Sequence, residues 1–408
     1  MHENYSRRRE KILNGVMESI DRLNPGIIVR DRNVKISSFC AGSTYSIISL
    51  GKAAVSMARG IDSAIVEKAN LRICISNNEN SGVDGFECFL GDHPVPGRNT
   101  ISSTEKIIGM LENDTAERLI VMLSGGASSI FEAHIDTITD EQYGNLMRNL
   151  IDGDYPIEEL NRIRYHLSKI KFGKLLDLCK YMKISIFAIS DIPGDQIFLI
   201  GSNPFYHAPD SYRRIPEEVS GYVMQAENSG NRKDIHVEYE IILNGSIYAK
   251  ELGILVNPEH HPLDLGRIIK GNVISLSTQI IDILRNHYSN THEPFWFTAY
   301  GESTAEVMGN GKGGRNSYLS ALILSQMYDG EIFSFLSLAT DGKDGNGNIA
   351  GFIVDDGLKK TVAAPDLKKY IGDSDTASLA ISSGTAVITG QTGNNVSDVI
   401  IGYYGGME

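Results

Sequence analysis

A glycine-rich segment at residues 300–316, YGESTAEVMGNGKGGRN, carries an acid and two cations close together in the sequence. Glu302 stands near its start, Lys312 lies inside the glycine run, and Arg315 follows that run. Glycines leave backbone amides uncovered, cations attract phosphate oxygens, and a carboxylate can hold a divalent metal ion. The segment therefore predicts phosphoryl-transfer chemistry, with Lys312 and Gly313 as phosphate contacts.

Two loops in the first half of the chain also follow predicted strands and offer groups that bind phosphate. In SLGKAA, Lys52 falls on the first turn of a predicted helix, where a cation opposes the helix dipole by roughly 0.3–1 kcal/mol unless an anion binds. A solvated surface lysine is the alternative interpretation. In LSGGASS, a tight turn without a ligand is the alternative to a phosphate site built from bare amides and hydroxyls. The candidate phosphate-binding residues there are Ser124, Gly125, Gly126, Ser128 and Ser129.

Acidic residues at other strand ends could hold a metal ion or accept a proton. Asp191 comes directly after a predicted strand, whereas Asp195, four residues on, could simply cap the next segment. Asp341 begins a loop with the Asp-Gly density of a calcium site, but Phe352 stands where an EF-hand needs glutamate. A magnesium-proximal acid and a ligand-free Asx-turn both remain open for Asp341. His93, in the loop GDHPVPG, is a candidate substrate contact.

Composition limits the class of protein. The 408 residues, 41% of them hydrophobic, can bury a large core, and the length favours two or three domains. No apolar run approaches the roughly 18 residues that span a bilayer, and the first residues lack a secretory signal, so we expect a cytoplasmic protein without a membrane partner. A net charge of −13 argues against nucleic acid as partner. Widely spaced cysteines favour buried thiols over disulfides or structural zinc, and a homodimer is the expectation from base rates.

The order of apolar runs predicts an α/β fold. Strands are expected at 45–50, 71–76, 118–123 and 184–190, with helices between them, which is typical of a mostly parallel sheet. Ligands in such sheets bind beyond the carboxyl ends of the strands. A polar, turn-rich stretch at 209–235 marks a boundary. We therefore expect a Rossmann-like domain at 1–235 and a second α/β domain at 236–408, each doubly wound with helices on both faces.

Ten motifs, in order, resemble the glycerate 2-kinase family, ATP-dependent enzymes whose C-terminal half is called the MOFRL domain. The motifs are SLGKAAVSMA, GDHPVP, LSGGASS, NRIRYHLSKIKFGKL, SDIPGD, GSNPF, YGEST, GKGGRN, ATDGKDG and TGQTGNNVSD. The resemblance implies transfer of the γ-phosphoryl group of ATP to the 2-hydroxyl of D-glycerate with Mg²⁺ or another divalent cation. It also implies two α/β domains with the active site in the cleft between them.

The resemblance also implies roles for particular residues. The family's motif lysine falls on Lys52 and its GGRN arginine on Arg315, and both are expected to place positive charge around the γ-phosphate, an effect worth on the order of 10³-fold in rate. The motif acids fall on Asp191, Glu302 and Asp341, the expected metal ligands, and Asp191 is alternatively the proton acceptor. The carboxylate of glycerate needs its own cation, which Arg164 or Arg315 could supply.

Three departures from the family pattern affect the local shape of these loops. Ala127 stands where a third glycine is common, Phe172-Gly173 replaces a pair of glycines, and GSNPF replaces a more usual serine-glycine-proline order.

Two rival functions remain to be separated from the kinase. A reductase of hydroxypyruvate or tartronate semialdehyde would need a GxGxxG turn after the first strand and an acid about twenty residues on. The turn at 50–53 has a single glycine, and 309–314 lacks the spacing. A non-catalytic nucleotide-binding module would need the glycine loops without the acids.

Overall fold

The computed structural model describes residues 4–78, 82–153, 155–223, 235–306 and 308–407. The chain divides into two compact units. One, the parallel-sheet unit, is Pro25–Leu243, and the other, the mixed-sheet unit, combines Met1–Asn24 with Asn244–Glu408. No helix among the described residues has the length and apolar character needed to cross a membrane.

The parallel-sheet unit is built on a sheet with strand order β3-β2-β1-β4-β5-β6, in which all neighbours run parallel. The central strands are buried along nearly their whole length, as expected when helices cover both faces of a sheet. The strand order reverses direction between β1 and β4, and this switch point is where open α/β sheets bind ligands. The strands are β1 (Tyr45–Leu50), β2 (Arg72–Ser76), β3 (Glu87–Leu90), β4 (Arg118–Leu123), β5 (Lys183–Ile189) and β6 (His236–Leu243).

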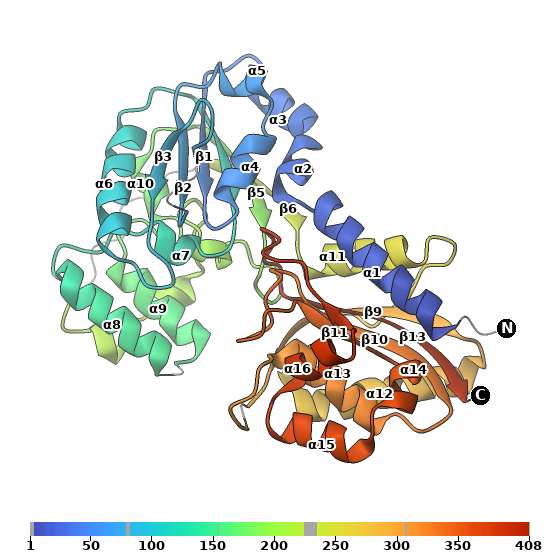
Figure 1. Cartoon of the computed structure of the whole chain (residues 1–408). Helices are drawn as coiled ribbons and strands as arrows, with labels where there is room; N and C mark the ends of the chain where they lie inside the picture. The colour runs from blue at the N-terminus through green and yellow to red at the C-terminus, as the bar shows by residue number, and fades with distance from the viewer. Residues whose placement is uncertain (1–3, 79–81, 154, 224–234, 307, 408) are drawn as a thin grey trace. The chain divides into compact units, whose positions relative to one another are not determined.

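Helices α2 and α4 cover one face of this sheet, and α6 and α10 lie on the other (Figure 1). Helices α8 and α9 pack around a small core of their own, formed by residues such as Tyr143 and Ile163. The helices are α2 (Pro25–Arg30), α3 (Asn33–Cys40), α4 (Ala54–Gly60), α5 (Ser63–Val66), α6 (Arg98–Glu112), α7 (Ala127–Ile130), α8 (Asp140–Asp152), α9 (Ile157–Leu167) and α10 (Lys174–Leu178), with 3₁₀ turns at Ile200–Ser202, Asp210–Arg213 and Glu217–Val219.

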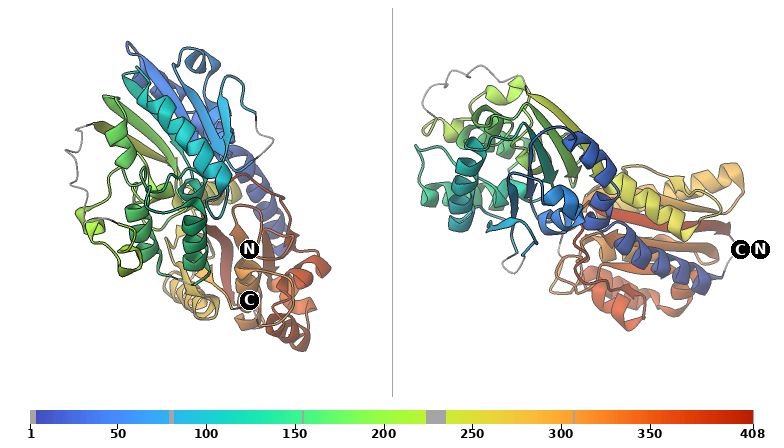
Figure 2. Two further views of the ribbon diagram at one scale, coloured as in Figure 1. Left: turned by 90° about the vertical axis from the view of Figure 1, so that its left-hand side faces the viewer. Right: turned by 90° about the horizontal axis from the view of Figure 1, so that it is seen from above.

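The mixed-sheet unit has strand order β12-β11-β10-β13-β9-β7, with β8 also paired to β9. Its central pairs are antiparallel, whereas β7 and β8 run parallel to β9. The expected arrangement of helices on both faces is confirmed: α1 and α11 lie side by side on one face, and α12 and α13 pack on the other (Figures 1 and 2). The strands are β7 (Leu263–Asp264), β8 (Ile269–Asn272), β9 (Phe295–Thr304), β10 (Glu331–Ala339), β11 (Gly351–Asp355), β12 (Ala386–Val387) and β13 (Asp398–Met407).

The helices of this unit come from both ends of the chain. Helix α1 buries its apolar stripe, including Ile12 and Val16, and its buried Arg8 binds Asp356 and the carbonyl of Phe333. The amphipathic pattern of such a helix does not reveal which sheet it covers. The helices are α1 (Tyr5–Arg22), α11 (Gly245–Val256), α12 (Val273–Thr291), α13 (Arg315–Gln326), α14 (Asp356–Thr361), α15 (Ala364–Gly372) and α16 (Thr376–Ser382).

The division of the chain differs from the sequence-based boundary at residue 235. Strand β6 follows that boundary, yet it pairs with β5 from Lys183↔His236 onward and completes the parallel sheet. Residues 1–24 group with the C-terminal half instead of the N-terminal half. Both differences arise from pairing across long sequence separations, which local composition does not encode.

Candidate functional site

The turn after β1 is locked to the turn after β4 at the switch point of the parallel sheet. The amide of Lys52 donates to the Gly125 carbonyl over 3.0 Å, and the amide of Ala53 donates to Ser124 Oγ over 3.1 Å. Gly51 has φ +109°, and a Cβ added there would lie 2.5 Å from Ser124 Oγ. The close approach therefore requires glycine. The Ser124 hydroxyl in turn donates to a β1 carbonyl over 3.1 Å, so this predicted phosphate contact joins the two loops.

The side chains of Lys52 and His93 lie against the backbone of Gly126. A Cβ added at Gly126, which has φ +82°, would lie 2.9 Å from Lys52 Cγ and 3.3 Å from His93 Cδ2. Burial and then the charge of Lys52 lower the pKa of His93, although the residue as a whole is exposed to solvent. His93 is therefore neutral at pH 7 beside a charged lysine, and it can accept or donate a hydrogen bond without adding charge.

Asp191, in the loop that follows β5, reaches the same place. A Cβ added at Gly125 would lie 2.2 Å from Asp191 Oδ2. Within the described chain, the amides of Gly125 and Gly126 donate to no protein acceptor. The structure thus brings together Lys52, His93, Asp191 and two amides that have no protein acceptor among the described residues, which we call the Lys52 site.

The rest of the LSGGASS loop is held by its neighbours. Ser129 Oγ donates to the Gly126 carbonyl over 3.2 Å, and the Ser129 carbonyl accepts from Thr100 Oγ1 over 3.0 Å. The same threonine hydroxyl accepts from the amide of Asp92 over 2.7 Å, which places the His93 loop next to this turn. The Ser128 carbonyl accepts from the buried ammonium group of Lys171. Sequence reasoning missed Thr100 and Lys171, although both lie in or beside quoted motifs.

Arg164 lies on α9 beside a buried ion pair. Its Nη1 donates to Asn161 Oδ1 over 3.4 Å, a long contact. Burial lowers the pKa of Arg164, and the nearby oxygens of Tyr143 and Glu132 oppose that effect. Glu132 pairs with Lys171 at 2.6 Å. The predicted substrate cation therefore belongs to a charged cluster that also contacts the LSGGASS loop.

In the mixed-sheet unit, Arg315 lies between two carboxylates. Its Nε and Nη2 contact the two oxygens of Asp398 at 2.6 and 3.2 Å, and Nη1 contacts Glu302 at 2.5 Å. Asp398 is 2% exposed and Glu302 is 53% exposed. Burial raises the pKa of Asp398 to about 6 against the opposing charge of Arg315. Burial disfavours the charged guanidinium, but the carboxylates outweigh it and raise the pKa of Arg315.

Asp398 was not predicted, although it ends the TGQTGNNVSD motif. Its only signal in the sequence is an acid placed directly before an apolar strand.

The amides of the GKGGRN loop already have protein acceptors. The Asp344 carboxylate, 1% exposed, accepts from the amides of Asn316 and Ser317 at 2.9 and 2.8 Å and thereby caps α13. The amide of Gly313 donates to Asn346 Oδ1 over 2.8 Å, and that of Lys312 donates to Asp375 Oδ1 over 2.9 Å. In this conformation the backbone of the loop has no amide to offer a phosphate at these positions, and the side chains of Lys312 and Arg315 remain.

Two of the three predicted metal acids, Asp341 and Glu302, have protein partners within the mixed-sheet unit. Asp341 Oδ1 accepts from the amide of Lys343 over 2.9 Å, which makes the Asx-turn that the sequence left open. Glu302 pairs with Arg315, and Asp191 belongs to the other unit. Among the described residues, no three His, Cys, Asp or Glu side chains gather as metal ligands.

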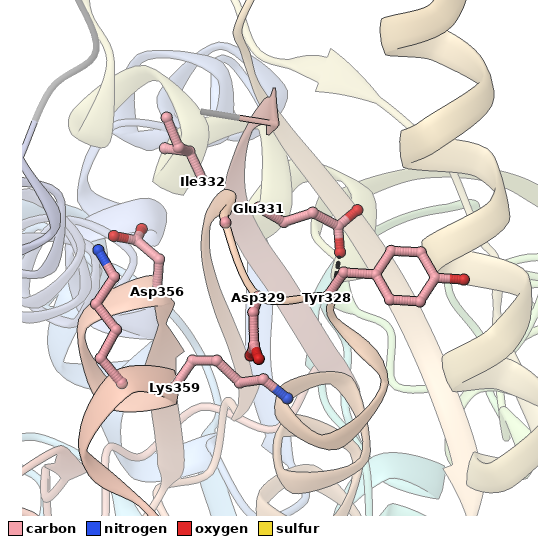
Figure 3. Close-up of a pocket in the computed structure, with 8 residues that line it drawn as sticks. Tyr328, Asp329, Glu331, Ile332, Asp356 and Lys359 are labelled. Atoms are coloured by element: carbon pink, nitrogen blue, oxygen red, sulfur yellow. Dashed lines mark hydrogen bonds between the residues drawn. The ribbon is translucent and has the colours of Figure 1, made fainter.

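A pocket of about 320 Å³ in the mixed-sheet unit lies around the β10 end of the sheet (Figure 3). Glu331 there is bound by Arg285 at 2.8 Å and by the hydroxyl of Tyr404 at 2.7 Å. None of the predicted site residues lines it; its labelled residues are Tyr328, Asp329, Glu331, Ile332, Asp356 and Lys359. We therefore assign none of the predicted catalytic or binding roles to this pocket.

Comparison with known proteins identifies the family. Residues 12–232 match the domain of unknown function DUF4147, and residues 296–398 match the MOFRL family. A glycerate 2-kinase from Picrophilus torridus is 31% identical over 97% of this chain and 96% of its own length, and a D-glycerate 2-kinase from Thermotoga maritima is 29% identical over 95% and 96%. A crystal structure of a Thermotoga maritima glycerate kinase matches with a TM-score of 0.84 and 27% identity, covering 97% of this chain and 99% of that one. The chain belongs to the glycerate 2-kinase family.

Proposed function

We propose that this protein is a glycerate 2-kinase that transfers the γ-phosphoryl group of ATP to the 2-hydroxyl of D-glycerate, giving 2-phosphoglycerate and ADP. One observation supports it above the others: a lysine, a carboxylate and two amides without a protein acceptor in the described chain meet at the switch point of a parallel sheet. Uncovered amides and a cation bind phosphate oxygens, and the carboxylate can take the proton of an attacking hydroxyl.

At the Lys52 site, each group has a distinct role in the proposed reaction. The amides of Gly125 and Gly126 and the ammonium group of Lys52 bind oxygens of the transferred phosphoryl group. The 2-hydroxyl oxygen of glycerate forms a bond to the γ-phosphorus as the bond from that phosphorus to the β,γ-bridging oxygen breaks. Asp191 accepts the hydroxyl proton, and ADP leaves with the bond's electron pair. His93, being neutral, is proposed to hold the substrate by a hydrogen bond.

Arg315 is proposed to exchange one of its acids for the ligand. Asp398 is buried and fixes the guanidinium, whereas Glu302 is half exposed and can turn toward solvent. The Nη1 group released by Glu302 can then bind an oxygen of phosphate or carboxylate, with Lys312 adding a second charge. Arg164 is the alternative partner for the carboxylate of glycerate.

Magnesium fits these residues only together with the nucleotide. Mg²⁺ is usually held by one or two carboxylates plus phosphate oxygens and waters, so the absence of a three-ligand group among the described residues is compatible with it. Asp191 is the proposed carboxylate ligand if it is not the base, and Glu302 is the second candidate. When bound, the ion would neutralise charge on the β- and γ-phosphates. A cytoplasmic location and a homodimer stay predictions of the sequence.

The reductase alternative is disfavoured by the turn after β1. The strand order is that of dinucleotide-binding folds, but Gly51 is packed against Ser124 and Lys52 follows it. Strand β2 ends at Ser76, followed by Asn77 and Asn78, where such folds place the acid that binds the ribose. The sequence at both places suits phosphate better than a nicotinamide cofactor.

The test is an ATP-consumption assay with D-glycerate and Mg²⁺, followed by phosphorus NMR of the product. The expected product is the 2-phosphate, whereas the 3-phosphate would contradict the assigned regiochemistry. A parallel reaction with NADH and hydroxypyruvate should show no loss of nicotinamide absorbance. ATP binding without turnover would instead support the non-catalytic binding module.

A further inference from the structure

A buried lysine lies directly behind the LSGGASS loop. The ammonium group of Lys171 pairs with Glu132 at 2.6 Å, and both side chains are 0% exposed. The same ammonium group donates to the carbonyl of Ser128, in the middle of the loop. Desolvating an ammonium group is unfavourable, so a lysine placed here needs both partners to stay charged.

The groups near the Lys171–Glu132 pair include two neutral hydroxyls and a second cation, Arg164. Glu132 accepts from the hydroxyl of Tyr143 over 2.7 Å and from Ser168 Oγ over 2.6 Å. Lys171 also lies close enough to Arg164 for the two charges to interact. With Tyr143 neutral, two cations face one carboxylate. A cluster that served only to hold the fold would be expected to balance its charges, whereas one beside an anion site would not.

The turn that carries Lys171 adopts a costly backbone conformation. Phe172 has φ +56° and Gly173 has φ +84°, a region that side chains other than glycine rarely adopt. Their amides donate to the carbonyls of Ser202 and Asn203 at 3.2 and 3.0 Å. Phe172 occupies one of the positions where the family pattern has glycine. Backbone strain of this kind persists where the surrounding structure fixes it, often at functional sites.

We propose that Lys171 is a positioning residue for phosphoryl transfer, which holds the LSGGASS loop in its phosphate-binding shape by binding the Ser128 carbonyl, with Glu132 as its counter-ion. This proposal rests on the proposed kinase function. By fixing α7 behind the loop, Lys171 sets the distance between the amides of Gly125 and Gly126 and the side chains of Lys52 and Asp191. A misplacement of about 1 Å in such a site lowers the rate by roughly 10²-fold.

The experiment separates positioning from mere stabilisation with three variants. Lys171→Met removes the ammonium group at similar volume, so Glu132 and the Ser128 carbonyl lose the cation that contacts them, and both stability and activity should fall. Lys171→Met combined with Glu132→Gln removes both charges of the pair, and the glutamine amide can accept from one of the two hydroxyls, Tyr143 and Ser168, and donate to the other. The control is Lys169→Met, which breaks a solvent-exposed pair with Asp136 in the same segment.

The double variant decides the proposal. We expect its melting temperature to recover only in part, because the buried Arg164 loses Glu132, while kcat/KM for ATP stays reduced by roughly 10²-fold and the control keeps full activity. Recovery of kcat/KM together with the melting temperature would overturn the proposal. Wild-type turnover of D-glycerate is measured first, because its absence contradicts the proposed function and not the role of Lys171.

The pH dependence of the wild type and of Lys171→Arg gives a second test that does not need the double variant to fold. Burial lowers the pKa of Lys171 to about 8, with Glu132 opposing that effect and Arg164 adding to it, and Tyr143 faces the same cluster. Activity should therefore fall above pH 8, and arginine, which stays protonated, should move that fall to higher pH. The lysine's contribution to stability has the opposite sign, rising from pH 8 to its unfolded pKa near 10.5. An unchanged profile in a folded Lys171→Arg variant would contradict the proposal.

Discussion

The two glycine loops of this protein look alike in sequence but differ in what their backbones do. In LSGGASS, the amides of Gly125 and Gly126 have no protein acceptor within the described chain, and charged side chains lie against them. In GKGGRN, the amides are bound by Asp344, Asn346 and Asp375. Glycines therefore serve two purposes here: in the first loop they leave two amides without a protein acceptor among the described residues, and in the second they allow loops of the protein itself to pack closely.

The largest expected effect is at the open loop. Lys52→Ala should lower kcat/KM by on the order of 10³-fold, because a cation on the transferred phosphate acts mainly in the transition state. The melting temperature should change little, since the amide of residue 52 still donates to Gly125. Lys68→Ala, an exposed lysine downstream, is the control. Equal activity of the two variants in a coupled ATP assay would remove Lys52 from the mechanism.

At the closed loop, Arg315→Ala should lower kcat/KM by at least about 10²-fold. The melting temperature should fall as well, because Asp398 would stay buried with Asn316 as its one remaining hydrogen-bond partner among the described residues. We expect a loss of about 1–3 kcal/mol in unfolding free energy. Adding Asp398→Asn should restore part of this stability in denaturant titrations without restoring activity. If stability and kcat/KM both recover in the double variant, Arg315 contributes to the stability of the fold and not to catalysis.

A pair of glycine substitutions compares the loops directly. Gly126→Ala forces an unfavourable φ and puts a Cβ 2.9 Å from Lys52 Cγ, so kcat/KM should fall about tenfold or more. Gly314→Ala puts a Cβ 2.3 Å from Asp344 Oδ1 and disturbs the cap of α13, so stability should fall by about 1–2 kcal/mol. Thermal unfolding and steady-state kinetics on both variants check this. A reversed pattern would mean that the closed loop is the one that binds phosphate.

The smallest effect expected is on the acid side of the pH profile. Because the pKa of Asp398 is raised to about 6, its protonation below that pH weakens its hold on Arg315, and kcat/KM should fall a few-fold. The stability contribution of Asp398 runs the other way: it is fully present below the unfolded pKa of 3.8 and is lost as pH rises through 6. Asp398→Asn should flatten both trends. An identical acid limb in that variant would assign the limb to another group.

Parallel-sheet topology made part of the site predictable. Lys52, Ser124 and Asp191 each follow a strand of a βαβ pattern, and the carboxyl ends of neighbouring parallel strands meet at one edge. The resemblance added the same positions independently. The order of strands is therefore enough to predict that these three residues lie close together, without any information on side-chain packing.

What escaped prediction depends on contacts between distant residues. Asp344 caps a helix that begins 29 residues earlier, and Asp398 holds an arginine 83 residues away. In the segment SKIKFGKL, the sequence pattern predicts that Lys171 is an exposed lysine. It is instead buried in an ion pair with Glu132, which lies 39 residues earlier. The local sequence pattern predicts strands, helices and turns. It does not predict which side chains accept hydrogen bonds from the backbone amides of a loop that is distant in the sequence.

The place of α1 has a consequence for synthesis. This helix is made before every strand that it covers, because those strands all lie beyond residue 244. The intervening segment Pro25–Leu243 is continuous and can begin to fold while translation proceeds. Until the last strands emerge, the apolar stripe of α1 has nothing to cover it, so the nascent chain carries an early hydrophobic surface that a chaperone could bind.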